Sequence, residues 1–245
     1  MEYRDIELNG FAIRAFRDVA DRDYIAARLV YRARLTSQFL WLALQAVEKY
    51  TKCILLLNRI DSRKVGHRLS KGFELIEKHA PFSLQLSESS KRLIEHLDTY
   101  GRFRYLETSY YVQGLELCTL DWCVWEIRRY CQLLNYEQNG ISMLKPLLRY
   151  IESADDYPRQ HFKVLGGHLE KIVEDSNHPA RPGLIWHNLC FGKSSRTVVR
   201  PPNYMESVNS PLSLRPQILD SVLEYVFLPK EVVEAYRKEL TKTCS

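Results

Sequence analysis

The sequence predicts an all-α protein in which a helical bundle is followed by a C-terminal helical extension. Apolar residues recur with helical spacing over long stretches of the chain, which is the main signal of amphipathic helices. Glycine and proline are sparse, at ten each among 245 residues, which is few for a loop-rich or all-β chain. The segment 115–134 contains neither residue, which favours an uninterrupted helix there.

The first predicted helix begins near Asp21 and Asp23, because negative charges suit a helix N-terminus. It continues through residues 24–34, where apolar residues recur on one face. Arg28 and Arg32 are four residues apart and lie together on a different face.

The second helix, over residues 35–58, gives the strongest periodic signal. Alternating steps of four and three residues separate its apolar positions, which places them on one helical face: Phe39, Ala43, Ala46, Tyr50, Cys53 and Leu57. A second face is polar and carries Gln45, Glu48, Lys49 and Lys52. Glu48 and Lys52 stand four residues apart in the order that favours an ion pair.

The remaining helices fall on either side of a break at residues 135–140. The N-terminal side holds short helices over 67–78 and 87–97, the second with a serine cap, and a long apolar helix over 107–134. The C-terminal side holds helices over 142–153, 158–174, 217–227 and 230–240, with loops at 175–183 and 192–216, an ambiguous apolar segment at 184–191 and a short strand at 197–199. The predicted domains are a helical bundle over 1–136 and a helical extension over 137–245, with an irregular loop near 192–216.

The composition bounds the environment of the protein. The formal net charge of +5 permits contact with phosphates without requiring it. The six cysteines form no C-x-x-C pair and lie mostly among apolar residues, which favours buried thiols in a reducing compartment. Without an apolar signal segment at the start or a long uncharged apolar run, we expect a cytoplasmic protein with no membrane contact.

Several catalytic and cofactor-binding motifs are absent from the sequence. It has no Walker loop, no G-x-G-x-x-G, no H-E-x-x-H and no G-x-S-x-G. These absences weaken the kinase, dehydrogenase, metalloprotease and esterase interpretations. We therefore expect neither a cofactor nor a bound metal.

Three short motifs, in order, resemble those of a known family. Residues 45–52 read Gln-Ala-Val-Glu-Lys-Tyr-Thr-Lys, His67-Arg68-Leu69 opens the next short helix, and Arg104-Tyr105 lies in a basic turn. This order is similar to that of HEPN domains, the "higher eukaryotes and prokaryotes nucleotide-binding" family. The resemblance covers roughly the first 136 residues and leaves the extension unexplained.

The resemblance implies an up-and-down helical bundle that is often a homodimer. Many family members are similar to metal-independent endoribonucleases that use an R-x(4–6)-H motif. Such chemistry is physically reasonable, because a histidine can move a proton near neutral pH and an arginine can neutralise phosphate charge.

This sequence departs from the catalytic pattern, since no histidine follows Arg104 at the required distance. The matching spacing occurs only in the extension, between Arg181 and His187. These two residues are the catalytic candidates; the alternative is a surface arginine near a tucked-in histidine.

The other candidate residues would bind nucleotide or RNA, or form an interface: Gln45, Glu48, Lys49, Lys52, His67, Arg102, Arg104 and Tyr105. For Glu48 and Lys52 the alternative is an ordinary exposed helix pair. For the segment from Arg102 to Tyr105 it is a turn whose side chains cover the core, rather than one that grips a phosphate and stacks a base.

These observations favour a nucleotide- or RNA-binding or assembly module that lacks the usual catalytic motif. One alternative is a metal-independent endoribonuclease, acting as a toxin or defence effector through Arg181 and His187. Another is a structural dimerisation protein. The partners we expect are RNA or a nucleotide, a second copy of the chain and a protein partner such as an antitoxin.

Overall fold

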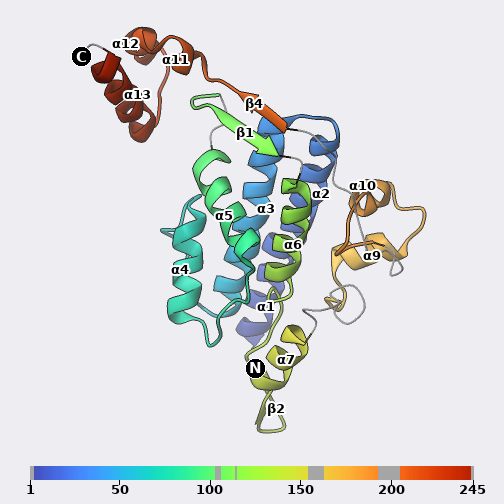
Figure 1. The fold of residues 1–245 in the computed structure, drawn as a ribbon. Helices are drawn as coiled ribbons and strands as arrows, with labels where there is room; N and C mark the ends of the chain where they lie inside the picture. The colour runs from blue at the N-terminus through green and yellow to red at the C-terminus, as the bar shows by residue number, and fades with distance from the viewer. Residues whose placement is uncertain (1–2, 103–105, 114, 154–162, 193–204, 244–245) are drawn as a thin grey trace.

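A computed structural model describes residues 3–102, 106–113, 115–153, 163–192 and 205–243. The fold is mostly helical, with two small two-stranded sheets in the described part, which confirms the predicted class. Figure 1 shows the N-terminal helices side by side as a bundle, with the last helices standing apart at one end. No helix among the described residues is long and apolar enough to span a membrane.

The chain begins with a helical run that is longer than predicted. α1 (Tyr3–Phe11) passes through a π-helical stretch (Ala12–Arg17) into α2 (Asp18–Arg32) without leaving helical backbone angles. The prediction that the first helix starts near Asp21 is therefore wrong. A π-helical stretch has a wider turn, so it shifts the residues before it out of register with the apolar face of α2.

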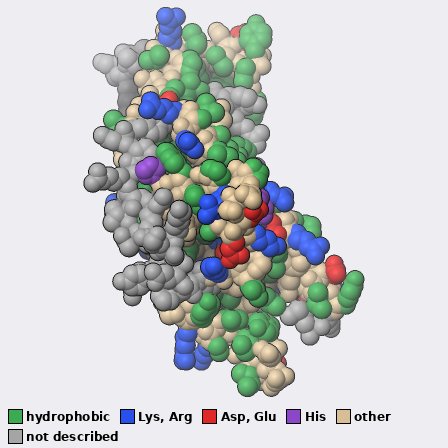
Figure 2. Space-filling model, turned by 90° about the vertical axis from the view of Figure 1, so that its right-hand side faces the viewer, with side chains coloured by type: hydrophobic (Ala, Val, Ile, Leu, Met, Phe, Trp, Pro, Cys, Tyr) green, Lys and Arg blue, Asp and Glu red, His purple; other side chains and the backbone are tan. Residues whose placement is uncertain are grey.

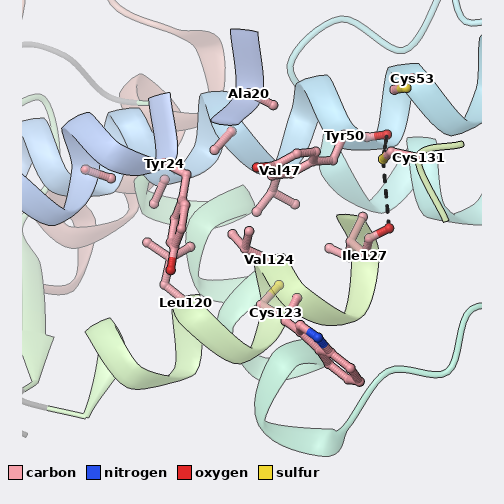
Figure 3. Packing of buried hydrophobic residues seen from close by; sticks show 14 of the residues in the cluster. Ala20, Tyr24, Val47, Tyr50, Cys53, Leu120, Cys123, Val124, Ile127 and Cys131 are labelled. Atoms are coloured by element: carbon pink, nitrogen blue, oxygen red, sulfur yellow. Dashed lines mark hydrogen bonds between the residues drawn. The ribbon is translucent and has the colours of Figure 1, made fainter. Parts of the chain in front are cut away.

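α3 (Thr36–Leu57) forms the centre of the bundle and packs along α2. Its predicted apolar face is confirmed, because every one of its six residues is buried. Figure 3 shows Val47, Tyr50 and Cys53 of α3 opposite residues in α6 and just after it, including Val124 and Cys131. The thiol of Cys131 donates to the backbone oxygens of Tyr50 and Ile127, at 3.4 and 3.8 Å.

α4 (Leu69–His79) and α5 (Glu88–Tyr100) complete one side of the bundle and agree with the predicted helices. The predicted serine cap is confirmed, because Ser87 Oγ accepts a hydrogen bond of 3.3 Å from the backbone N–H of Ser90.

The predicted helix over 107–134 is wrong at both ends. β1 (Tyr110–Gln113) replaces its first turns, and α6 covers only Glu116–Arg128. β1 pairs antiparallel with β4 (Met205–Val208), so that Tyr110 lies opposite Val208 and Gln113 opposite Met205. The partner strand lies about 95 residues along the chain, and no local pattern announces such a pairing.

A short hairpin of β2 (Glu137–Gln138) and β3 (Ile141–Ser142) begins inside the predicted break at 135–140. Asn139 and Gly140 form its turn with φ values of 52° and 76°, as a two-residue hairpin loop requires. The division into a bundle over 1–136 and an extension over 137–245 remains a prediction.

The extension has two parts that pack differently. α7 (Leu144–Glu152), α9 (His168–Glu174) and α10 (Arg181–Ile185) contribute to the bundle's own core through Ile151, Leu169, Ile172 and Leu184. α11 (Pro211–Leu214), a 3₁₀ turn (Pro216–Ile218), α12 (Leu219–Leu223) and α13 (Lys230–Thr243) form the C-terminal lobe, which has a small core of its own: Leu212, Leu219, Leu228, Val232 and Tyr236.

Some predictions for the extension are corrected. The helix predicted over 158–174 begins only at His168 within the described residues, and the helix predicted over 217–227 ends at Leu223. α10 starts inside the loop predicted over 175–183. The strand predicted at 197–199 lies outside the described residues.

Candidate functional site

Polar side chains of α3 and of the following loop surround one carboxylate, that of Glu48. Lys52 Nζ lies 2.6 Å from Glu48 Oε1, and His67 Nδ1 lies 2.8 Å from Glu48 Oε2. Gln45 Nε2 donates to Oε2 at 3.4 Å. Together with Lys49 these residues form what we call the α3 polar cluster: Gln45, Glu48, Lys49, Lys52 and His67.

Glu48 is only 4% exposed. The alternative, an ordinary exposed helix pair, is therefore wrong for Glu48. Its i,i+4 contact with Lys52 is nevertheless present. A buried carboxylate needs partners that compensate for its lost hydration, and Lys52 and His67 supply them.

The cluster extends onto α2 through Lys49. Its ammonium pairs with Asp23 of α2 and donates to Gln45 Oε1 at 3.2 Å. Asp23 was expected to mark the start of a helix, but it lies inside α2 and faces α3. The ion pair and hydrogen bonds therefore fix both Lys49 and Gln45 in position.

His67 enters the cluster from the loop between α3 and α4. Its side chain is 59% exposed although Nδ1 contacts a buried carboxylate, so the ring lies at the boundary between protein and solvent. The Trp41 ring lies 6.0 Å away, centroid to centroid. A carboxylate on Nδ1 orients an imidazole and leaves Nε2 to act on another group.

A run of basic side chains flanks His67. Arg63, Lys64, Arg68 and Lys71 are exposed over the loop and the start of α4; we call these four the basic segment. Arg63 pairs with Asp61 at 2.7 Å, and Lys71 donates to the Lys64 carbonyl oxygen at 3.0 Å. Together the four residues present positive charge at one edge of the α3 polar cluster.

A second polar network joins α2 to α6 through two reciprocal pairs. Arg128 Nε of α6 lies 2.7 Å from Asp21 Oδ1 of α2, and Arg28 of α2 pairs with Asp121 of α6. All four side chains are buried.

The same network holds the extension against the bundle. Arg128 Nη1 also lies 2.7 Å from Glu170 of α9, and Arg28 donates to the carbonyl oxygens of Gly183, at 3.2 Å, and of Trp186. Burial raises the pKa of the Asp121 carboxyl, while Arg28 beside it acts in the opposite direction. These contacts are structural, since the carboxylates of Asp21 and Asp121 are both buried.

The sequence carried a signal of this network that was missed. Each helix has an aspartate and an arginine seven residues apart, Asp21 with Arg28 and Asp121 with Arg128. Seven residues are two helical turns, so both charges lie on one face. Two such helices side by side and antiparallel bring each aspartate to the other helix's arginine.

The catalytic candidates Arg181 and His187 lie elsewhere. Arg181 Nε donates to the Val173 carbonyl oxygen at 2.9 Å, and the His187 ring lies 4.7 Å from that of Trp186. α10 lies beside α2, on the other side of the bundle from α4 (Figure 1). On the face that bears α9 and α10, basic side chains are scattered among acidic and apolar ones (Figure 2).

The basic turn predicted to grip a phosphate is only partly described. Arg102 Nη1 lies 3.0 Å from Glu231 Oε1 of α13, so it contacts the C-terminal lobe. Arg104 and Tyr105 lie outside the described residues. Five of the eight predicted binding residues therefore come together, and they do so in the α3 polar cluster.

A separate pair of titratable groups lies between α5 and α6. His96 Nε2 is 3.8 Å from Glu116 Oε1, and the rings of Tyr100 and Tyr111 lie 4.8 and 4.9 Å from that of His96. Burial raises the pKa of Glu116 to about 7 and lowers that of His96. Hydrogen bonds with the β1 backbone, at Gln113 and Tyr111, oppose each shift. No local sequence pattern indicates this pair, because its members lie in separate elements.

Residues 13–121 match the model of the HEPN domain family, a range that runs from the π-helical stretch into α6. No curated protein and no solved structure matches the chain. The matched range contains the whole α3 polar cluster and excludes Arg181 and His187. The N-terminal half of this chain, over residues 13–121, is a HEPN domain.

Proposed function

We propose that this HEPN domain binds RNA or a nucleotide at the surface formed by the α3 polar cluster and the basic segment. The observation that carries the proposal is the 2.8 Å contact between His67 Nδ1 and Glu48 Oε2. It fixes an exposed imidazole at the edge of the helix that carries the family motif.

The cations of this surface are of two kinds, those paired with carboxylates and those that are not. Lys49 and Lys52 are paired with carboxylates, so they contribute little net positive charge. Lys64, Arg68 and Lys71 are exposed and make no ion pair among the described residues. We assign phosphate contact to these three, because exposed cations attract a polyanion.

We assign contact with the base and the ribose to the rings of His67 and Trp41. Imidazole and indole rings stack on bases, and His67 Nε2 can exchange a hydrogen bond with a phosphate or a ribose hydroxyl. The position of both rings beside exposed cations supports single-stranded RNA as the ligand.

The test is a binding titration of fluorescent single-stranded RNA at several salt concentrations. We expect salt-dependent binding that is weakened at least about tenfold by the double variant Lys64→Glu/Arg68→Glu. The matched control is the double variant Lys145→Glu/Arg149→Glu, which changes two exposed cations of α7 and should bind like wild type. Equal weakening by both double variants would refute the proposed surface.

A second candidate function, metal-independent RNA cleavage, is favoured by the same His67–Glu48 contact. A neutral imidazole held by a carboxylate can accept the proton of a ribose 2′-hydroxyl. Incubation with RNA in the presence of a chelator tests it. Cleavage lost in His67→Ala and kept in His187→Ala would support this site; the reverse would support Arg181 and His187; intact RNA would remove both.

Assembly is the third part of the proposal. The family resemblance supports a homodimer and a protein partner such as an antitoxin. Light scattering of the purified chain would measure the first, and a monomer at every concentration tested would contradict it.

A further inference from the structure

A groove of about 840 Å³ runs between α4 and α5, and no residue of the α3 polar cluster lines it. Its apolar lining includes Phe73 and Ile76 of α4, Ile94 of α5, and Leu84 and Leu86 of the connecting segment. Phe73, Leu84 and Leu86 are only partly buried, so they offer apolar surface to a partner. Burial of such a surface drives association.

The rim of this groove is predominantly acidic, in a protein whose overall charge is positive. Five carboxylates line it against three cations: Glu74, Glu77, Glu95, Asp98 and Glu231 against Arg68, Lys91 and Arg102. Two of the cations are already paired, Lys91 with Glu88 at 2.7 Å and Arg102 with Glu231 at 3.0 Å.

The carboxylates differ in what they can still bind. Asp98 caps α4 by accepting from the backbone N–H groups of Leu69, at 2.8 Å, and Ser70, at 3.2 Å, and Glu77 accepts from Ser83 Oγ at 3.0 Å. Glu74 and Glu95 have no side-chain partner among the described residues. They lie on the two opposite walls, one on α4 and one on α5.

The shape suits a short helix. α4 has 11 residues, which gives the wall a length of about 16 Å, or three helical turns. Arg102 and Glu231 of α13, which form an ion pair, also line the groove, so the C-terminal lobe contributes to it. An apolar floor between two helices is the usual seat of an amphipathic helix.

We propose that this groove docks an amphipathic helix of a protein partner, with lysine or arginine residues flanking its apolar face. The apolar face covers Phe73 and Leu86, and the flanking cations pair with Glu74 and Glu95. RNA is a poor occupant, because the acidic rim repels phosphate. The groove shares Arg68 with the basic segment but includes no residue of the α3 polar cluster.

The test uses the full chain and a synthetic 14-residue helical peptide with leucine on one face and lysine on its flanks. A peptide with glutamate in place of each lysine is the matched probe. We expect the lysine peptide to bind, the glutamate peptide to bind at least about tenfold more weakly, and the double variant Glu74→Lys/Glu95→Lys to reverse this preference.

The control variant Glu137→Lys/Glu224→Lys makes the same change in net charge at two exposed carboxylates that do not line the groove. It should keep the wild-type preference. The variant Phe73→Ala should weaken both peptides by removing apolar contact. Equal binding of the two peptides by wild type, or equal effects of the groove and control variants, would overturn the proposal. RNA binding should not weaken in Glu74→Lys/Glu95→Lys, because this variant keeps all four cations of the basic segment.

Discussion

His67 Nδ1 lies 2.8 Å from Glu48 Oε2, so a buried carboxylate of α3 holds an exposed ring from the following loop. This contact connects the burial of Glu48, the compensation of its charge and the position of a side chain that can contact a ligand. Packing within the bundle buries Glu48, although Glu48 lies on the polar face of α3. Burial requires partners for its charge, and one of those partners is a side chain that can contact a ligand.

Replacing Glu48 by glutamine should destabilise the fold. The variant keeps the shape of the side chain but removes the charge that Lys52 and His67 compensate. We expect a loss of about 1–3 kcal/mol in the free energy of unfolding, measured by urea titration. Glu174→Gln is the control, because that carboxylate is 63% exposed in its pair with Lys163. Equal effects of the two substitutions would contradict the buried role of Glu48.

The reciprocal pairs between α2 and α6 should be more costly to break. Arg128→Met leaves Asp21 and Glu170 without their shared cation in a buried setting. We expect a loss of about 3–5 kcal/mol, or failure to fold at all. The double variant Asp21→Asn/Arg128→Met should recover part of the loss, because it removes the uncompensated charge.

The control for this prediction is Arg63→Met, which breaks the exposed pair with Asp61. Its unfolding midpoint should not change measurably. A fully additive double variant would show that Asp21 and Arg128 do not depend on one another.

The stability of the protein should depend on pH through Glu116. Burial raises the pKa of this carboxyl to about 7 from its ordinary value of 4.5. The folded state therefore favours the protonated form, and the stability that Glu116 contributes is present at low pH and is lost as pH rises through about 7. His96 acts in the opposite direction: burial lowers its pKa, so its contribution is present above 6.5 and is lost as pH falls.

Urea midpoints measured from about pH 5 to about pH 8 test this prediction. Relative to wild type, Glu116→Gln should gain stability as pH rises, because the amide cannot ionise. Glu137→Gln, at an exposed position, should follow wild type at every pH. Parallel curves for wild type and Glu116→Gln would contradict the raised pKa of Glu116.

Much of the helical bundle could be predicted because its signals are local. The apolar face of α3, from Phe39 to Leu57, repeats over about five turns. Its polar residues lie on the same helix, so their proximity followed from helical spacing alone. His67 was found through a family pattern, and the structure adds the reason for its position, the contact with Glu48.

The rest could not be predicted because it depends on distant parts of the chain. β1 forms only against β4, and the buried charges of α6 are stable only against those of α2. An aspartate and an arginine in an apolar helix are ambiguous until their partners are known. His96 and Glu116 meet for the same reason, through the packing of α5 and β1 on α6.

The most direct test of the central claim is to map where RNA contacts the chain. Single-stranded RNA containing 4-thiouridine would be crosslinked to the full chain by ultraviolet light, and the modified peptides identified by mass spectrometry. We predict crosslinks at Trp41 and in the segment 63–71, and their loss in Lys64→Glu/Arg68→Glu. Crosslinks confined to α10 and the segment around His187 would contradict the proposed surface.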